Sequence, residues 1–174
     1  MTAAKSELEL RREFDQLSRR LRPDLYRYAF WLGRDRQLAE DVVQEALLRA
    51  WKAYRDLADP SSAKAWMISI VRREFARTFE RKRLETLDIS DYEQQLAGDE
   101  DDPRVEEMRQ AIFELEVDYR EPLALQILLG HTTREIAELM DLTEGAVLTR
   151  LHRARAKLRQ AIGPDQSGDG SNKS

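Results

Sequence analysis

The sequence predicts an all-α protein in which two small helical domains are joined by a flexible acidic linker. Apolar residues recur three or four positions apart through most of the chain, the spacing of a helix that buries one face. No stretch keeps the apolar–polar alternation of a half-buried strand. The helical period disappears at 85–104, where acidic residues dominate. The domains are therefore predicted at 1–84 and 105–163, followed by a disordered tail at 164–174.

The first domain is predicted to hold three helices. The first covers 6–31, and Pro23 inside it predicts a kink or a new start, because proline lacks an amide donor. The second and third helices are expected over 38–54 and 63–83. Two serines of the loop before the third helix are its candidate N-caps: Ser61 and Ser62.

The second predicted helix carries a polar face at positions i, i+3 and i+4, formed by Asp41, Gln44 and Glu45. Paired carboxylates can act as general acid and base, but that role needs a cleft and shifted pKa values, which the sequence does not indicate. Such a face more commonly meets solvent or the arginines of a partner. We therefore predict no catalytic residue here, and a solvated face and a docking face both remain open.

The third predicted helix has an apolar side and a strongly basic exposed side. Trp66 lies on the apolar side with Ile70, which favours core packing over base stacking. The exposed side carries the cations Arg72, Arg73, Arg77, Arg81 and Lys82.

The second domain is predicted to begin with helices at 105–117 and at 122–129, where a proline is tolerated at the helix start. Two short helices with a tight turn follow over 132–158. Thr132 and Glu135 have the spacing of a capping box, in which each side chain satisfies a free amide at the helix start. Asp141 begins the break between the helices, and Thr143 can cap the second one.

The last of these helices has two contrasting faces. One apolar stripe must be buried: Val147, Leu151, Ala154 and Leu158. Polar and basic residues lie away from the stripe or beside it: Thr149, His152 and Arg153, flanked by Arg150 and Arg155. A surface hairpin with a solvated charged face would share this pattern. The paired caps, the short turn and the lack of acids from 147 to 159 favour a helix-turn-helix that enters the DNA major groove.

Composition excludes several classes of function. The 174-residue chain has no cysteine and only two histidines, so neither a disulfide framework nor a metal site is expected. No cofactor motif is present, and an enzyme is the least expected class. No apolar run approaches a membrane span, and no signal-peptide core begins the chain, so we expect a cytoplasmic protein without membrane insertion.

The net charge of −4 conceals a strong asymmetry along the chain. Between residues 85 and 107 there are ten acids and one base, so this segment carries −9 and the remainder carries +5. The basic blocks lie at 72–83 and 150–159. Local charge matters more than the total when phosphate is the partner. One hypothesis is that the acidic linker shields the basic faces from DNA in the free protein.

Three stretches together resemble the extracytoplasmic-function, or group IV, sigma factors of bacterial RNA polymerase. They are LYRYAFWLGRDRQLAEDVVQEALLRAWKAY at 25–54, AKAWMISIVRREFARTFERKR at 63–83 and DYREPLALQILLGHTTREIAELMDLTEGAVLTRLHRARAKL at 118–158. The resemblance covers almost everything except the linker and the tails. It implies sigma region 2 at the N-terminal side and region 4 at the C-terminal side.

The resemblance also implies partners and roles for the polar faces. Asp41, Gln44 and Glu45 would bind the clamp coiled coil of core RNA polymerase. The loop at 56–63 and the basic third helix would meet the single-stranded −10 element, whose backbone phosphates would be held by Arg72, Arg73, Arg77, Arg81 and Lys82. The helix at 144–158 would read the double-stranded −35 element through Thr149, His152 and Arg153, with Arg150 and Arg155 nearer phosphate. An anti-sigma factor is a further expected partner.

Two positions depart from the family pattern. Arg73 stands where many members have asparagine, which puts the −10 preference in question, and Leu148 stands where lysine or arginine is common. Two other classes of protein remain as alternatives. A sigma-like decoy would bind an anti-sigma factor without DNA, but it would have no need of basic helices. A helix-turn-helix repressor would have no need of the polar face at 41–45.

Overall fold

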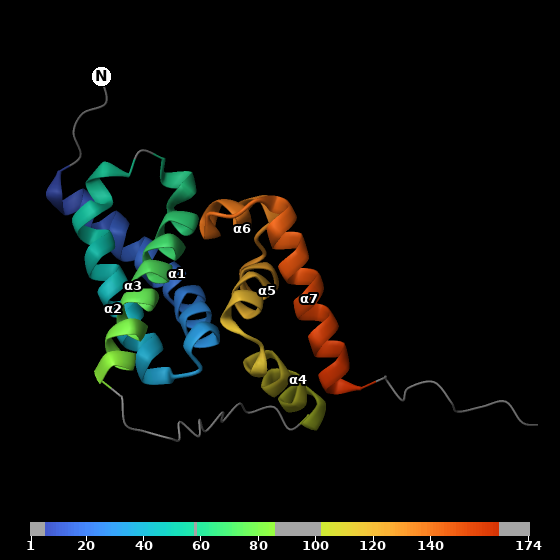
Figure 1. The fold of residues 1–174 in the computed structure, drawn as a ribbon. Coiled ribbons are helices and arrows are strands. Elements are labelled where there is room, and N and C mark those ends of the chain that lie inside the picture. Colours follow the sequence, from blue (N-terminus) through green and yellow to red (C-terminus); the bar gives the residue numbers. More distant parts are fainter. Residues whose placement is uncertain (1–5, 58, 86–101, 164–174) are drawn as a thin grey trace, which may run out of the picture. The chain divides into compact units, whose positions relative to one another are not determined.

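The computed structural model describes residues 6–57, 59–85 and 102–163 (Figure 1). These residues form helices and short 3₁₀ turns without any strand, so the predicted all-α class is confirmed. One compact unit contains α1, α2 and α3, and the other contains α4, α6, α7 and α5 as far as Gln126. The centre of the predicted linker, 86–101, and the predicted tail, 164–174, lie outside the described residues.

The first unit is a bundle in which α1 (Glu7–Gly33), α2 (Arg36–Ala53) and α3 (Ala63–Glu85) each pack against the other two. Tyr28 of α1, Val42 of α2 and Ile68 of α3 are fully buried in its core. Of the apolar side predicted for α3, Met67, Val71 and Phe75 are buried, whereas Trp66, Ile70 and Phe79 remain partly or largely exposed. Trp51 of α2 packs on Phe14 of α1, with ring centroids 5.3 Å apart.

Helix α1 is continuous through Pro23, so of the two outcomes predicted there, a kink or a new start, the new start is wrong. Pro23 lies on the exposed side of the helix, whereas Leu21 and Leu25 on either side of it are buried. Packing of these leucines holds the helix together across the missing amide hydrogen bond. The N-terminus has a full capping box, in which Ser6 and Glu9 each accept the other's backbone amide hydrogen.

At the turn from α1 to α2, the backbone of Gly33 lies very close to the ring of Phe75. Arg34 adopts the left-handed conformation with φ 59°, and Asp35 accepts the amide of Leu38, so α2 begins at Arg36 and not at the predicted Leu38. A β-carbon at Gly33 would lie 2.8 Å from Cε2 of Phe75 and 2.9 Å from Cδ2 of Leu38. Any side chain at position 33 would therefore push on the core.

A short 3₁₀ turn with its own cap precedes α3. After the 3₁₀ turn η1 (Tyr54–Asp56), a second 3₁₀ turn, η2 (Pro60–Ser62), leads directly into α3. Asp59 accepts the amide of Ser61 at 2.8 Å and its hydroxyl at 2.6 Å. These two hydrogen bonds from Ser61 lower the pKa of the Asp59 carboxyl. Asp59 thus caps η2, and both serines lie inside this turn and donate their hydroxyl hydrogens back to Asp59. The serine cap of α3 stays a prediction.

The second unit begins with α4 (Pro103–Glu114) and α5 (Val117–Leu129). Helix α4 starts at Pro103, two residues before the predicted position, because Asp102 caps it through the amide of Arg104. Helix α5 starts five residues before Pro122, so the predicted start at this proline is wrong. Buried Arg120 explains the close connection of the two helices. Its guanidinium donates to the carbonyls of Phe113 and Leu115 at 2.8 and 2.9 Å.

Candidate partner and nucleic-acid interfaces

The polar face of α2 is open to a partner. Gln44 and Glu45 are exposed, and half-buried Asp41 accepts a hydrogen bond from Nε2 of Gln37 at 2.9 Å. Within the described residues, no group of histidines and carboxylates could hold a metal ion. The amide and carboxylates of the face can bind cationic or amide groups of a protein.

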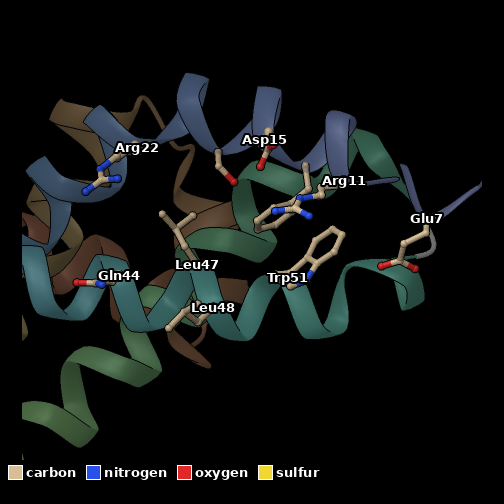
Figure 2. A pocket seen from close by; sticks show the side chains of 10 residues that line it. Glu7, Arg11, Asp15, Arg22, Gln44, Leu47, Leu48 and Trp51 are labelled. Atoms are coloured by element: carbon tan, nitrogen blue, oxygen red, sulfur yellow. The ribbon is translucent and has the colours of Figure 1, made fainter. Parts of the chain in front are cut away.

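A groove of about 660 Å³ with a mixed polar and apolar lining lies between α1 and α2 beside this polar face (Figure 2). Gln44 belongs to both surfaces, since it also lines the groove. The apolar part of the lining comes from Phe14, Leu47, Leu48 and Trp51, and the α1 wall adds the charged side chains Arg11, Asp15 and Arg22. Leu48 is 52% exposed. Sequence periodicity did not predict the groove, because Leu47 and Trp51 fall on the buried side of the helical pattern.

The basic side of α3 is narrower than predicted. Arg73, Arg77 and Arg81 are exposed at i, i+4 and i+8, which places them on one stripe of the helix. Arg72 and Lys82 are half-buried and lie off this stripe. The structure therefore brings three of the five predicted −10 cations together.

Glu74, which lies next to this stripe, is a buried acid that sequence reasoning did not single out. Its side chain is 5% exposed, and its Oε1 lies 2.6 Å from Nε of Arg49 on α2 and 3.4 Å from Nη1 of Arg77. Two arginines thus balance the charge of the buried carboxylate. Arg77 contributes to the stripe and to the contact between α2 and α3 at the same time.

Helices α6 (Thr133–Met140) and α7 (Glu144–Ile162) form the predicted helix-turn-helix. The predicted capping box is confirmed, because Thr132 and Glu135 each accept the other's backbone amide hydrogen. The amide and hydroxyl of Thr132 hold the pKa of the Glu135 carboxyl below its usual value. Asp141 adopts the left-handed conformation with φ 54°, and Thr143 caps α7 by accepting the amide of Ala146.

The faces of α7 are arranged as the periodicity predicts. Val147, Leu151 and Ala154 are buried, and Leu158 is half-buried. The predicted readers Thr149, His152 and Arg153 are all exposed.

The flanking cations of α7 are held by acidic and polar residues around α5. Nη1 of Arg150 lies 3.5 Å from Oδ1 of Asp118, and Arg155 donates to the side-chain oxygen of Gln126. Lys157 lies 3.4 Å from Oε1 of Glu116 and 5.0 Å from the ring centroid of Tyr119. These contacts fix the sides of α7 and leave its exposed face for a ligand.

Two family models match the chain in the order of its two units. Sigma-70 region 2 matches residues 17–85, and sigma-70 region 4 matches residues 105–158. A sigma factor SigL of Mycobacterium tuberculosis is 33% identical over 147 residues, which cover 79% of this chain and 82% of SigL. This chain belongs to the extracytoplasmic-function sigma factors. Members of this family are regulatory factors of transcription initiation and not enzymes.

Other relatives agree with the family assignment. The sigma factor SigX of Bacillus subtilis is 28% identical over 151 residues, which cover 79% of this sigma factor and 77% of SigX. Among solved structures, Bartonella quintana RpoE in complex with the anti-sigma factor NepR has a TM-score of 0.72 and 25% identity. That match covers 88% of this chain and 99% of RpoE. CnrH in complex with the cytosolic domain of CnrY has a TM-score of 0.65 and 26% identity, covering 87% and 88% of the two chains.

The described part of the sigma factor contains no helix that is long and apolar enough to cross a membrane.

Proposed function

We propose that this sigma factor binds core RNA polymerase, directs it to specific promoters through the −35 and −10 elements, and assists promoter opening. The observation that carries the proposal is the exposed face of Asp41, Gln44 and Glu45 in a chain that also carries region 4. Region 4 alone would suit a repressor, whereas a polar docking face on region 2 suits a polymerase subunit.

Docking on core polymerase uses both surfaces of α2. Glu45 and Asp41 bind basic side chains of the partner, and the groove at Leu48 accepts its apolar side chains. Gln44 contributes to both contacts. The charged face orients the partner and raises the rate of association, while the apolar side chains of the groove provide the buried area.

DNA recognition is divided between the two units. The stripe of Arg73, Arg77 and Arg81 on α3 holds the backbone of the −10 strand. Arg72 and Lys82 lie off the stripe and contribute less. In the −35 element, Thr149, His152 and Arg153 read base edges, while Arg150 and Arg155 stand close to phosphate.

An anti-sigma factor is the proposed inhibitory partner. The supporting observation is that RpoE and CnrH were both solved as complexes, with NepR and with the cytosolic domain of CnrY. We propose that the inhibitor covers the same α2 surface that binds core polymerase, so that inhibition and transcription exclude one another.

The test combines run-off transcription on a promoter library with gel filtration of the sigma factor mixed with core polymerase. Co-elution and promoter-dependent transcripts are expected. Replacing Asp41, Gln44 and Glu45 by alanine should abolish both, whereas Glu107→Gln, which changes an exposed acid of α4 outside the proposed interfaces, should change neither. Transcripts that survive the triple replacement would refute the docking face. Co-elution without any transcript would point to an altered −10 pocket around Arg73 or to a regulatory role.

A further inference from the structure

The exposed face of α7 contains a large apolar side chain, Leu148. It is 57% exposed, whereas its neighbours Val147 and Leu151 are fully buried. Every residue of α7 belongs to the described part of the chain, and Leu148 is the one large apolar side chain of this helix that is exposed. Its exposure therefore does not follow from the packing of the second unit.

The position of Leu148 along the helix places it at the reading end. Thr143 caps α7, and Leu148 lies in the second turn, one residue before Thr149 and one turn before His152. In a helix-turn-helix, the N-terminal residues of the second helix contact base edges in the major groove. Leu148 and His152, four residues apart, lie on the same side of the helix.

Thr149, the predicted reader next to Leu148, has no hydroxyl hydrogen left to donate to a base. The hydroxyl of Thr149 donates to the carbonyl of Gly145 at 2.9 Å, so its hydrogen is already used by the helix backbone. Thr149 can still offer an acceptor lone pair and a methyl group, and Leu148 offers only methyl groups. The apolar feature of the major groove is the C5-methyl group of thymine.

We propose that Leu148 determines part of the −35 specificity by packing against the C5-methyl group of one thymine. The inference rests on the proposed function, in which α7 enters the major groove of the −35 element. It adds a defined base preference at the position that Leu148 reaches. The polar and cationic residues farther along α7, His152 and Arg153, read the adjoining positions.

Deoxyuridine provides a direct probe, because it pairs like thymine and lacks only the methyl group. The full-length sigma factor bound to core polymerase first selects its preferred −35 sequence from a promoter library. Each thymine of that sequence, on either strand, is then replaced singly by deoxyuridine, and promoter affinity is measured. At one position we expect affinity to fall about fourfold, the factor for removing one buried methyl group.

Variants connect this loss to Leu148. With Leu148→Ala, affinity for the thymine promoter should fall and the difference between thymine and deoxyuridine should disappear. Leu148→Lys should likewise not distinguish the two bases, although its added charge strengthens binding to phosphate. Leu8→Ala, which truncates an exposed leucine of α1, is the matched control and should keep the native difference. Because residue 148 is exposed, these variants are expected to fold.

The outcomes separate the inference from the proposed function. If the holoenzyme selects no −35 sequence, the proposed function of α7 fails. If it selects a sequence that lacks thymine, or if deoxyuridine is tolerated at every position, the role of Leu148 is overturned. A deoxyuridine loss that persists undiminished in Leu148→Ala overturns it as well, because another residue must then contact the methyl group.

Discussion

Glu74 is the residue where electrostatics and packing meet in the first unit. Its carboxylate is buried between Arg49 of α2 and Arg77 of α3, yet these two arginine side chains are 48% and 61% exposed. If the carboxylate is removed, both arginines can recover hydration. The cost should therefore be smaller than for a buried pair that leaves a stranded charge.

We expect Glu74→Ala to lower the free energy of unfolding by about 1–3 kcal/mol, the range for losing a hydrogen-bonding partner at a buried site. Glu74→Gln keeps the shape and one acceptor and should cost less. Urea denaturation followed by circular dichroism measures both values. The control Arg77→Ala should cost about 1 kcal/mol or less, because it breaks the longer and more exposed pair. Equal stability of Glu74→Ala and the native protein would contradict this account.

Asp24 makes folding stability depend on pH. Burial would raise the pKa of this carboxyl, but hydrogen bonds and charge from Lys64 and Arg27 outweigh burial and hold the pKa below 3.8. The folded-state pKa is thus lower than the unfolded-state value, so the stabilisation is present above pH 3.8 and is lost as the pH falls through the folded value. Asp24→Asn should flatten the acid limb of a stability–pH profile. Parallel native and variant profiles would show that Lys64 and Arg27 do not act on Asp24.

At the scale of helices, features that depend on residues close in sequence could be predicted, and features that depend on tertiary packing could not. The caps of α6 and α7 could be predicted because each depends on residues within three positions: Thr132 with Glu135, and Thr143 with Ala146. The start of α5 could not be predicted from Pro122. The helix begins five residues before this proline, and its start depends on Arg120, which donates to the carbonyl of Phe113 near the end of α4.

The same division applies to the candidate site. The exposed readers of α7 follow from periodicity alone. The stripe of Arg73, Arg77 and Arg81 follows from helical spacing within α3, whereas the pairing of Glu74 with Arg49 and the groove at Leu48 each depend on a second helix. No pattern within one helix contains that information.

Pro23 offers a test of how packing overrides helix propensity. A proline inside a helix costs about 3 kcal/mol relative to alanine, because it removes a hydrogen bond and its ring crowds the preceding turn. We expect Pro23→Ala to stabilise the protein by roughly 1–3 kcal/mol in thermal or urea unfolding. Gln16→Ala, another exposed change on α1, should have little effect. A loss of stability in Pro23→Ala would mean that the restriction proline places on the unfolded chain dominates.

At the scale of the whole molecule, the net charge of −4 combines a strongly acidic central segment with a remainder that is positively charged. Six acids lie within residues 86–101, outside the described residues: Asp88, Asp91, Glu93, Asp99, Glu100 and Asp101. Replacing all six by their amides would change the net charge from −4 to +2. Long-range attraction between this chain and a polyanion should change accordingly.

If the acidic segment shields the basic faces, the amide variant should bind nonspecific DNA more tightly in the absence of polymerase. The expected gain is roughly tenfold at low ionic strength and decreases as salt screens the charges. Fluorescence anisotropy with a labelled duplex measures it. A variant with the same residues of 86–101 in shuffled order keeps the net charge and should bind like the native protein. An unchanged affinity of the amide variant would reject the shielding hypothesis.

The close approach at Gly33 limits how promoter specificities can be engineered by exchanging segments between sigma factors. Position 33, the last residue of α1, has no room for a β-carbon while Phe75 of α3 and Leu38 of α2 keep their places. A graft that brings a larger residue to position 33 would need a smaller ring at position 75, and a graft of α3 would face the reciprocal constraint. Chimeras that exchange α3 together with the turn at 33–35 should therefore fold more often than chimeras that exchange α3 alone.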